Sequence, residues 1–120
     1  MPDAAATAPA PADAEAALAF LTEMSPDLRG GAILTADGTV LAASGEATAW
    51  AEEAVDLLRV ADAAGEEPVE QLHVATQAGE VFALRHAGLA AVVVTERFAL
   101  SSITFFDMRA ALRELAAKSD

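Results

Sequence analysis

The sequence predicts an α/β (α+β) three-layer sandwich, in which a central, largely antiparallel sheet of five strands carries helices on both faces. Three segments have apolar residues at the three- and four-residue spacing of an amphipathic helix, and five shorter segments have the composition of strands. Their order along the chain is αββαβββα. The last strand, LAAVVVT at residues 89–95, is apolar at almost every position, which is typical of a central strand covered on both faces. We therefore expect one helix on one face of the sheet and two helices on the other.

The composition is that of a single acidic domain. The 120 residues are 54% hydrophobic, which is enough to bury one core, and the chain is too short for two ordinary domains. There are 19 acidic residues against 7 basic ones, for a net charge of -12, so phosphate backbones and anionic lipid headgroups should repel the chain. We therefore expect no nucleic-acid partner. The chain has no cysteine, which excludes disulfides and thiolate metal sites and favours a cytoplasmic location.

The first twelve residues, MPDAAATAPAPA, are expected to form a disordered arm. Three prolines interrupt the alanines and Asp3 is the sole charge, so a continuous helix is disfavoured. A signal peptide would need a basic start and a leucine-rich core, and this segment has neither. The longest strongly apolar run, residues 89–94, is far shorter than the roughly 20 residues that span a bilayer, so we expect no membrane insertion. Residues 13–118 then form the single domain.

The segment after the arm predicts the first helix. Asp13 is the expected N-cap, because its carboxylate accepts hydrogen bonds from the free N–H groups of a first turn. Apolar residues then recur at helical spacing as far as Met24. Pro26 and the pair Gly30-Gly31 are expected to end this helix, since proline and glycine both interrupt helical geometry.

A β-hairpin and a second helix follow. Strands at residues 32–36 and 39–44 flank Asp37-Gly38, two residues that tolerate the positive φ angles of a type I′ turn. The second helix covers residues 48–63, with apolar residues on one stripe and acidic residues at other angles. The apolar stripe consists of Trp50, Ala54, Leu57, Leu58 and Ala61.

The second half of the chain predicts a three-stranded meander. Its strands are expected at residues 70–77, 80–86 and 89–95, because Ala-Gly pairs separate these segments. In the first of them, one side of the strand carries Leu72, Val74 and Thr76, and the other carries Gln71, His73, Ala75 and Gln77. That pattern places it nearer an edge of the sheet than the continuously apolar last strand.

The closing helix, residues 100–117, has two apolar sides. Its main stripe includes Phe105 and Met108, while Ile103 and Phe106 recur on nearly the opposite side. A surface helix needs one apolar face. The second side is therefore either an interface with another protein, or a surface that the first helix or the N-terminal arm covers.

The sequence carries no recognised catalytic or ligand-binding constellation. His73 and His86 lie in separate strands without a third metal ligand at recognisable spacing, so both are expected to be strand-surface histidines. Capping of the last helix explains Ser101 and Ser102. The pair Gly30-Gly31 precedes no lysine at the spacing of a phosphate loop. We therefore expect no catalytic residue, no cofactor and no metal.

The order and wording of these elements resemble the Roadblock/dynein light-chain domain family. The resemblance rests on the hairpin AILTADGTVLAAS, the long second helix with an early Trp50, the strands HVATQAGEVFALRHAGLAAVVVT and the closing LRELA helix. It implies a non-catalytic homodimeric binding or scaffold module that regulates a Ras-like small GTPase, as a GTPase-activating protein or an adaptor, in a bacterial signalling or polarity system. The alternative is a PAS-like or profilin-like domain for ligand sensing or protein interaction.

The resemblance also implies where partners bind. Members of the family pair through the second helix and the third strand to make one continuous sheet, and a polar edge strand is itself a template for strand addition. The candidate dimer residues are Trp50, Ala54, Leu57, Leu58, Ala61, Gln71, His73, Ala75 and Gln77. The candidate residues for a GTPase or an operon-encoded signalling protein are Glu52, Glu53, Asp56, Ile103 and Phe106. An acidic helix face would steer a basic patch on the partner, an effect that salt screens.

Overall fold

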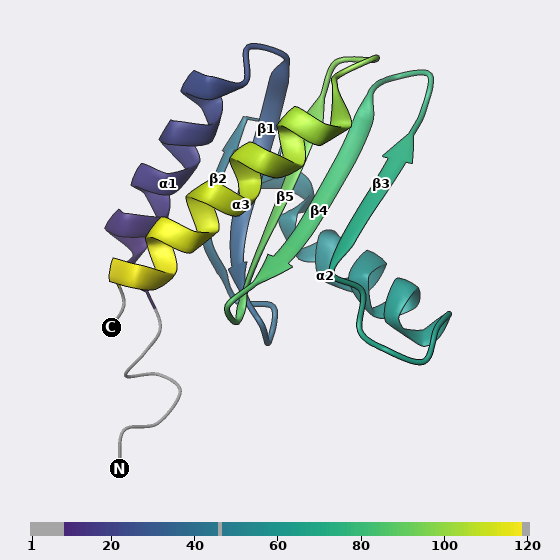
Figure 1. Ribbon diagram of the computed structural model, residues 1–120, viewed down its shortest axis with the longest axis horizontal. Coiled ribbons are helices and arrows are strands. Elements are labelled where there is room, and N and C mark those ends of the chain that lie inside the picture. The colour runs from purple at the N-terminus through teal and green to yellow at the C-terminus, as the bar shows by residue number, and fades with distance from the viewer. Residues whose placement is uncertain (1–8, 46, 119–120) are drawn as a thin grey trace.

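The computed structural model describes residues 9–45 and 47–118, except for the side chains of residues 48–52 and 55. The chain has the predicted order of elements (Figure 1). The helices are α1 (Pro11–Met24), α2 (Ala47–Ala63) and α3 (Ser101–Lys118). The strands are β1 (Leu28–Thr35), β2 (Val40–Gly45), β3 (Gln71–Ala75), β4 (Glu80–His86) and β5 (Leu89–Thr95).

The strands form one five-stranded sheet in the order β2-β1-β5-β4-β3, and each neighbouring pair is antiparallel. Helices α1 and α3 lie on one face and α2 lies on the other, so the predicted three-layer sandwich is confirmed (Figure 1). Strand β5 is central, and all of its residues except Val94 are buried. The sheet ends at β2 on one side and at β3 on the other.

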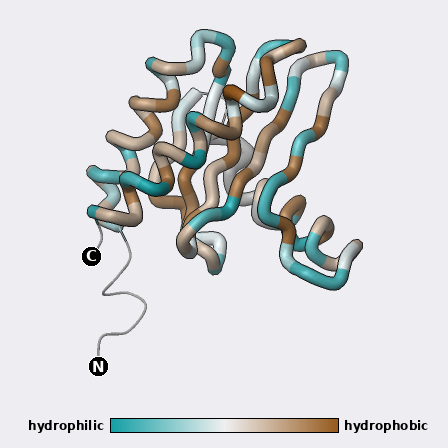
Figure 2. Tube along the Cα trace, in the orientation of Figure 1, coloured by the Kyte–Doolittle hydropathy of each residue, from teal (hydrophilic) through white to brown (hydrophobic). Residues whose placement is uncertain are grey.

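Two apolar clusters, one on each face of the sheet, hold the layers together. The larger cluster joins α1 and α3 to strand residues such as Ile33, Phe82 and Val93. The smaller cluster joins Ala54 and Leu58 of α2 to the opposite face of the strands. Successive residues of β5 enter the two clusters in turn, as the two-residue period of a strand requires. Figure 2 shows the resulting concentration of hydrophobic residues along the strands.

Helix α1 begins earlier than the sequence predicted. It starts at Pro11, with Ala10 as an N-cap that makes no side-chain hydrogen bond, so Asp13 lies in the first turn rather than at the cap. Proline suits the start of a helix because the first turn has no use for its missing N–H. The last two residues of the predicted arm are therefore helical, and residues 1–8 lie outside the described residues.

The pair Gly30-Gly31 does not end the first helix but lies inside β1. A Cβ atom at Gly31 would lie 2.8 Å from Cδ1 of Leu18 and 3.2 Å from Cγ1 of Val93. The absent side chain therefore lets α1 approach the sheet closely at this point. The prediction failed because glycine was interpreted as a chain break, whereas here it is required by packing between two elements.

The β1–β2 turn differs from the predicted type I′ turn. Of its two central residues, Gly38 has a positive φ of 95° and Asp37 does not. The Gly38 N–H donates to the Thr35 carbonyl at 3.0 Å, and the Thr35 N–H donates to the Thr39 carbonyl at 2.9 Å. This pattern fits a three-residue turn with a glycine bulge. Hydrogen bonds from the Thr35 hydroxyl and the Thr39 N–H lower the pKa of Asp37.

Strand β3 ends at Ala75, two residues before its predicted end. The hydroxyl of Thr76 donates to the Gly79 carbonyl at 2.7 Å and accepts the N–H groups of Ala78 and Gly79, both at 3.1 Å. These bonds turn the chain toward β4. Gln77, a predicted dimer residue of this strand, therefore lies in the turn.

Gly45→Ala is expected to destabilise the fold more than Gly88→Ala, although both glycines have a positive φ. A Cβ atom at Gly45 would overlap the Arg29 carbonyl oxygen, whereas nothing lies within 4 Å of a Cβ atom at Gly88. The left-handed conformation alone costs a residue with a side chain roughly 1–2 kcal/mol. Urea unfolding should show about that loss for Gly88→Ala and a clearly larger one for Gly45→Ala. Equal losses would contradict this account of Gly45.

Candidate functional site

The candidate site is the free edge of the sheet at β3. The Glu70 carbonyl accepts the Arg85 N–H at 2.8 Å, and the Thr76 N–H donates to the Gly79 carbonyl at 2.9 Å. In an antiparallel ladder the main-chain groups of alternate residues point to the same side of the strand. The even-numbered residues of this segment therefore bond to β4. The N–H and C=O groups of the odd-numbered residues, Gln71, His73 and Ala75, point away from the sheet.

The helices leave β3, the outermost strand at this edge, incompletely covered. Helix α2 packs mainly over β2, β1 and β5, and α3 packs mainly over β4 and β5, so neither helix packs over β3 to a comparable extent. On the α2 side, Leu72 and Val74 of β3 are half-buried. On the same side of the sheet, α2 exposes Leu57 at 37% and Val60 at 68%. The α2 side of the sheet therefore carries apolar side chains that the described residues leave partly exposed.

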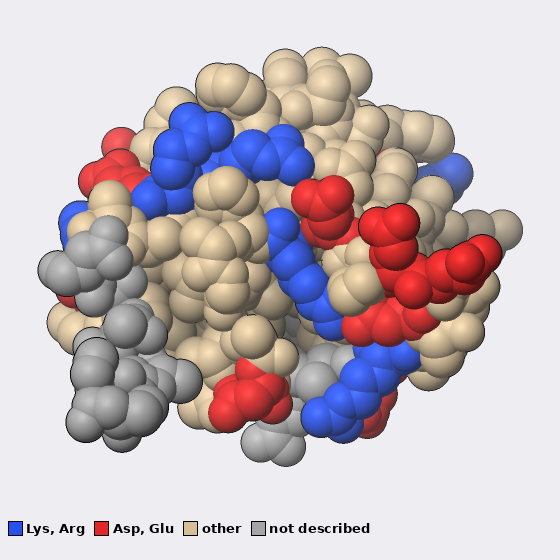
Figure 3. Space-filling view, turned by 60° about the horizontal axis from the view of Figure 1, so that its bottom comes forward, with Lys and Arg blue, Asp and Glu red and all other residues tan. Residues whose placement is uncertain are grey.

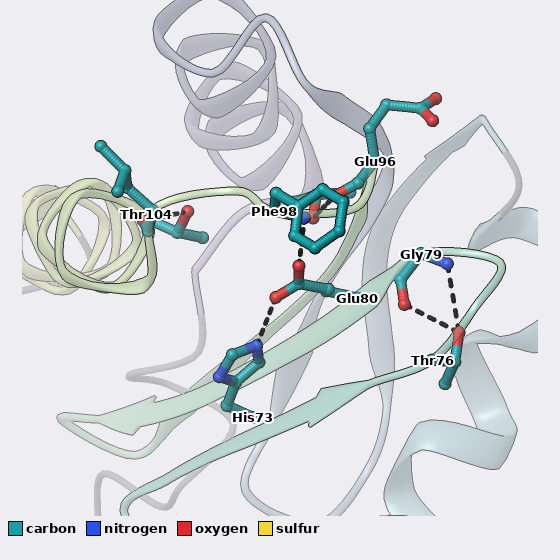
Figure 4. Close-up of polar contacts among 9 residues, drawn as sticks. His73, Thr76, Gly79, Glu80, Glu96, Phe98 and Thr104 are labelled. Atoms are coloured by element: carbon teal, nitrogen blue, oxygen red, sulfur yellow. Dashed lines mark hydrogen bonds and ion pairs between the residues drawn. The ribbon is translucent and has the colours of Figure 1, made fainter.

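On the α3 side, a buried carboxylate ties β3 to the rest of the domain (Figure 4). The His73 Nε2 lies 2.6 Å from Oε1 of Glu80, whose side chain is 8% exposed. The other Glu80 oxygen accepts the N–H of Phe98, which comes from the loop before α3. The imidazole of His73 also stacks on the Phe82 ring at 4.3 Å between centroids. His73 is thus a strand-surface histidine, as the sequence predicted, and its neighbours hold it in place.

Glu80 is expected to stay ionised although it is buried. The hydrogen bond from His73, and next to it the one from the Phe98 N–H, lower the pKa of this carboxyl from its ordinary value of 4.5, while burial acts in the opposite direction. The two directed hydrogen bonds that the carboxylate accepts compensate for the loss of its contacts with water. The described part of the chain leaves no buried side-chain nitrogen or oxygen without a hydrogen-bond partner.

A cleft of about 470 Å³ lies on the α2 face, between the end of α2 and the β1–β2 and β4–β5 turns (Figure 3). Its floor is apolar and includes Leu34 and Leu58. In its wall, the Arg85 guanidinium binds both carboxylate oxygens of Asp62, at 2.7 and 2.9 Å, and the Val69 carbonyl at 3.0 Å. The Arg85 hydrogen bond, and after it the Val69 N–H, lower the pKa of Asp62.

These charged groups join separate segments of the fold. Asp62 accepts the Val69 N–H at 2.7 Å as well as Arg85, so the carboxylate joins α2, the segment before β3 and β4. Among the described residues, no three His, Asp or Glu side chains form a group that could hold a metal ion. None of the described helices combines the length and the hydropathy of a membrane span.

No protein-family model matches this sequence, and no curated protein matches it. Solved structures do match its fold. The Roadblock/LC7 domain from Streptomyces avermitilis has a TM-score of 0.74 at 20% identity, over 85% of this chain and 93% of that chain. The gliding protein MglB from Thermus thermophilus has a TM-score of 0.75 at 16% identity, over 92% of this chain and 91% of that chain. This chain has the Roadblock/LC7 fold.

The Roadblock/LC7 fold overlaps in shape with that of profilins. LokiProfilin1, solved in complex with rabbit actin, has a TM-score of 0.64 at 13% identity, over 92% of this chain and 99% of that chain. This score is below those of the two structures above, but another structure of a Roadblock/LC7 domain from Streptomyces avermitilis has a TM-score of 0.62. The profilin-like alternative therefore shares the general architecture, and the TM-score does not separate the two.

Within the Roadblock/LC7 fold, the predicted dimer residues divide by location. Ala54 and Leu58 are 6% and 5% exposed, because they pack between α2 and the sheet of the same chain. They are core residues, and their assignment to an interface is corrected. Leu57 and Ala61 of α2 remain at least partly accessible, as do Gln71, His73 and Ala75 in β3. The side chain of Trp50 lies outside the described residues.

The predicted partner-facing residues fall on two separate surfaces of the Roadblock/LC7 fold. Glu53 and Asp56 are exposed on α2, and the side chain of Glu52 lies outside the described residues. Ile103 and Phe106 are 54% and 71% exposed on α3. The described part of α1 therefore does not cover this side of α3. Residues 1–8 of the N-terminal arm, the other cover that the sequence suggested, lie outside the described residues.

Sequence reasoning did not single out Val60 or Glu80. Val60 follows Leu57 by three residues, so helical spacing alone could have placed the two side chains on the same side of α2. The position of Glu80 follows from the register of β3 against β4, in which His73 is opposite Phe82. Glu80 is two residues from Phe82 and shares its side of the sheet. That register could be inferred once both strands were assigned.

Replacing Glu80 by glutamine is expected to flatten the acid dependence of stability. Because the folded-state pKa of Glu80 is depressed, the charged carboxylate stabilises the native state above pH 4.5. That contribution is lost as the pH falls through the folded-state pKa. Urea unfolding at pH 7 and in steps below pH 4.5 should show Glu80→Gln losing less stability on acidification than the parent protein. Parallel acid curves for the two proteins would show that Glu80 does not make this contribution.

Proposed function

We propose that this chain is a non-catalytic binding module that forms a homodimer through the β3 edge. The observation that carries the proposal is the row of outward main-chain groups at Gln71, His73 and Ala75. A second copy would pair its own β3 there in antiparallel register and make one continuous sheet of two subunits. A two-fold axis near His73 would relate the two copies of β3, because each subunit would use the same strand edge.

The apolar surface on the α2 side supports the same pairing. Leu57 and Val60 of α2 are exposed, and Leu72 and Val74 of β3 are half-buried on that side of the sheet. A second α2 packed across this surface would remove these side chains from water, at about 25 cal/mol per Å² of apolar area. Strand pairing would supply register, and the apolar contact would supply affinity.

We further propose that the dimer regulates a Ras-like small GTPase, as a GTPase-activating protein or an adaptor, in a bacterial signalling system of the cytoplasm. The support is the similarity in fold to MglB, described as a gliding protein, together with the exposed carboxylates of α2. These carboxylates border the apolar dimer surface on the same side of the helix, so the GTPase would bind at the rim of the dimer contact. Glu53 and Asp56 are exposed on α2, and a chain with a net charge of -12 would attract a basic patch on the GTPase. An operon-encoded signalling protein with such a patch is the other candidate partner.

A profilin-like interaction domain or a PAS-like sensor is the second candidate function. The fold similarity to LokiProfilin1 favours the former, and the 470 Å³ cleft beside α2 favours the latter, since small-molecule sites have about this size. Both alternatives are compatible with a monomer. The oligomeric state therefore distinguishes them from the proposed dimer.

Ala75→Pro is expected to convert the dimer into a monomer. Proline removes an outward N–H from β3 while leaving the hydrogen bonds of the even-numbered residues to β4. Light scattering after size-exclusion chromatography should give twice 12.3 kDa for the parent protein and 12.3 kDa for the variant. Ala75→Val is the matched control, because it changes the same side chain and keeps the N–H. A monomeric parent protein, or a dimeric Ala75→Pro variant with an unchanged dissociation constant, would refute the edge pairing.

Reversing charges on α2 is expected to weaken GTPase binding in low salt. The measurement uses a Ras-like GTPase encoded beside this gene, loaded with GDP or a GTP analogue, at 50 and 300 mM NaCl. The double variant Glu53→Lys/Asp56→Lys should bind about tenfold more weakly than the parent at the lower salt concentration, and the difference should shrink at the higher one. Glu114→Lys on α3 serves as a control with a similar change in charge. If the parent protein neither binds the GTPase nor changes its GTP hydrolysis, the proposed regulation is wrong.

A further inference from the structure

A second exposed apolar surface lies at the beginning of α3, and we call it the α3 patch. Its members are Phe98, Leu100, Ile103 and Phe106, which are 78%, 66%, 54% and 71% exposed. These four large apolar side chains lie within nine consecutive residues. Scattered exposed apolar residues are common in proteins, but a contiguous group of this kind marks an interaction site.

The α3 patch is not part of the core face of the helix. The sheet-facing side of α3 is formed by residues such as Met108, Ala111 and Leu115, which are buried. Ile103 and Phe106 are three residues apart and lie on the opposite side of the same helix. No rotation of the helix buries both sets at once. The solvent-facing side therefore has its own apolar stripe.

Phe98 is held in its exposed position by the backbone. Its φ is 67°, a conformation that costs a residue with a side chain roughly 1–2 kcal/mol. The buried Glu80 carboxylate accepts the Phe98 N–H, and the Arg97 guanidinium lies 4.5 Å from the centroid of the Phe98 ring. Strain of this kind persists where the surrounding structure fixes it, and it concentrates at functional sites. The ring is thus presented to the solvent in a preorganised position.

The charge around the α3 patch has the opposite sign to that of the whole chain. Residues 97–118 contain Arg97, Arg109, Arg113 and Lys118 against Asp107 and Glu114, whereas the chain has 7 basic and 19 acidic residues. Asp107 is buried, and Arg113 is exposed. Arg109 and Arg113 follow Phe106 by three and seven residues, so they border the apolar stripe on the same side of the helix.

We propose that the α3 patch binds an acidic amphipathic helix of a partner protein. The apolar side of that helix would contact Phe98, Ile103 and Phe106, and its carboxylates would pair with Arg109 and Arg113. Recognition of a helix by an apolar stripe with flanking charges is a common mode of protein association. The proposal does not depend on the homodimer or on the GTPase, because the α3 patch lies on the face of the sheet opposite α2.

Two other occupants fit the chemistry less well. An anionic membrane would attract the arginines, but it would repel the rest of a chain with a net charge of -12. A second copy packed by α3 against α3 would bring the same arginines together, and Glu114 is the one exposed carboxylate among the described residues of this helix. An acidic partner helix satisfies both the apolar and the basic parts of the surface.

The test measures the binding of synthetic peptides to the full chain by fluorescence anisotropy. The probe is a fluorescein-labelled 18-residue peptide with leucines at helical spacing on one side and glutamates on both flanks. A scrambled peptide of the same composition and a lysine version of the probe are the matched ligands. The probe should bind about tenfold more tightly than the scrambled peptide, and less tightly as salt increases.

Variants then locate the binding site and test its charge. Phe106→Ser and the double variant Arg109→Glu/Arg113→Glu should each weaken probe binding about tenfold. Met24→Ser on α1, which changes an exposed apolar side chain outside both proposed interfaces, should leave probe binding unchanged. The double variant should also gain affinity for the lysine peptide. Melting temperatures near that of the parent protein verify that each variant is folded.

The proposal fails if the probe and the scrambled peptide bind equally, or if Phe106→Ser leaves probe binding unchanged. It also fails if phosphatidylglycerol vesicles bind the parent protein and not the double variant while the probe does not bind, since the occupant would then be a membrane. A change in mass by light scattering for Phe106→Ser would indicate a second copy instead of a partner helix.

Discussion

The central strand β5 has to be covered on both faces of the sheet, and the layout of the molecule depends on this constraint. Its residues enter two clusters in turn, so a helical layer is needed on each side. Two helices share one face, while α2 alone serves the other. A helix about 10 Å wide spans two or three strands spaced about 4.8 Å apart. Helix α2 covers β2, β1 and β5 on its side of the sheet. The outermost strand β3 therefore keeps an accessible face as well as a free edge.

The sequence predicted best those elements whose limits are set by local chemistry. The bounds of β4 and β5 agree with the prediction, because the Ala87-Gly88 turn separates two uninterrupted strand patterns. Both turn residues have a positive φ, at 56° and 79°, as a type I′ turn requires. The prediction had assigned this turn type to Asp37-Gly38 instead. Gly31 was misinterpreted for a different reason, since its role depends on Leu18 of a separate element.

The candidate site was predictable in position but not in its contacts. The alternating polar pattern of residues 70–77 identified β3 as an edge strand, and its place at the end of the sheet confirms that prediction. The pairing of His73 with Glu80 depends on the register of two strands, and the Phe98 N–H donates its hydrogen bond to the same Glu80 carboxylate from the loop before α3. Neither follows from the periodicity of a single element. The two apolar sides of α3 were evident in the sequence because helical spacing alone reveals them.

Glu80 has a consequence for the dynamics of the domain. One carboxylate group accepts hydrogen bonds from His73 in the edge strand and from Phe98 in the loop before α3. Fraying of β3 therefore deprives the loop of part of its support, and displacement of the loop leaves a buried charge with a single partner. We therefore expect the edge strand and the start of α3 to open together in local unfolding. An event that orders either segment should then raise the hydrogen-exchange protection of the other, although the two lie on different surfaces.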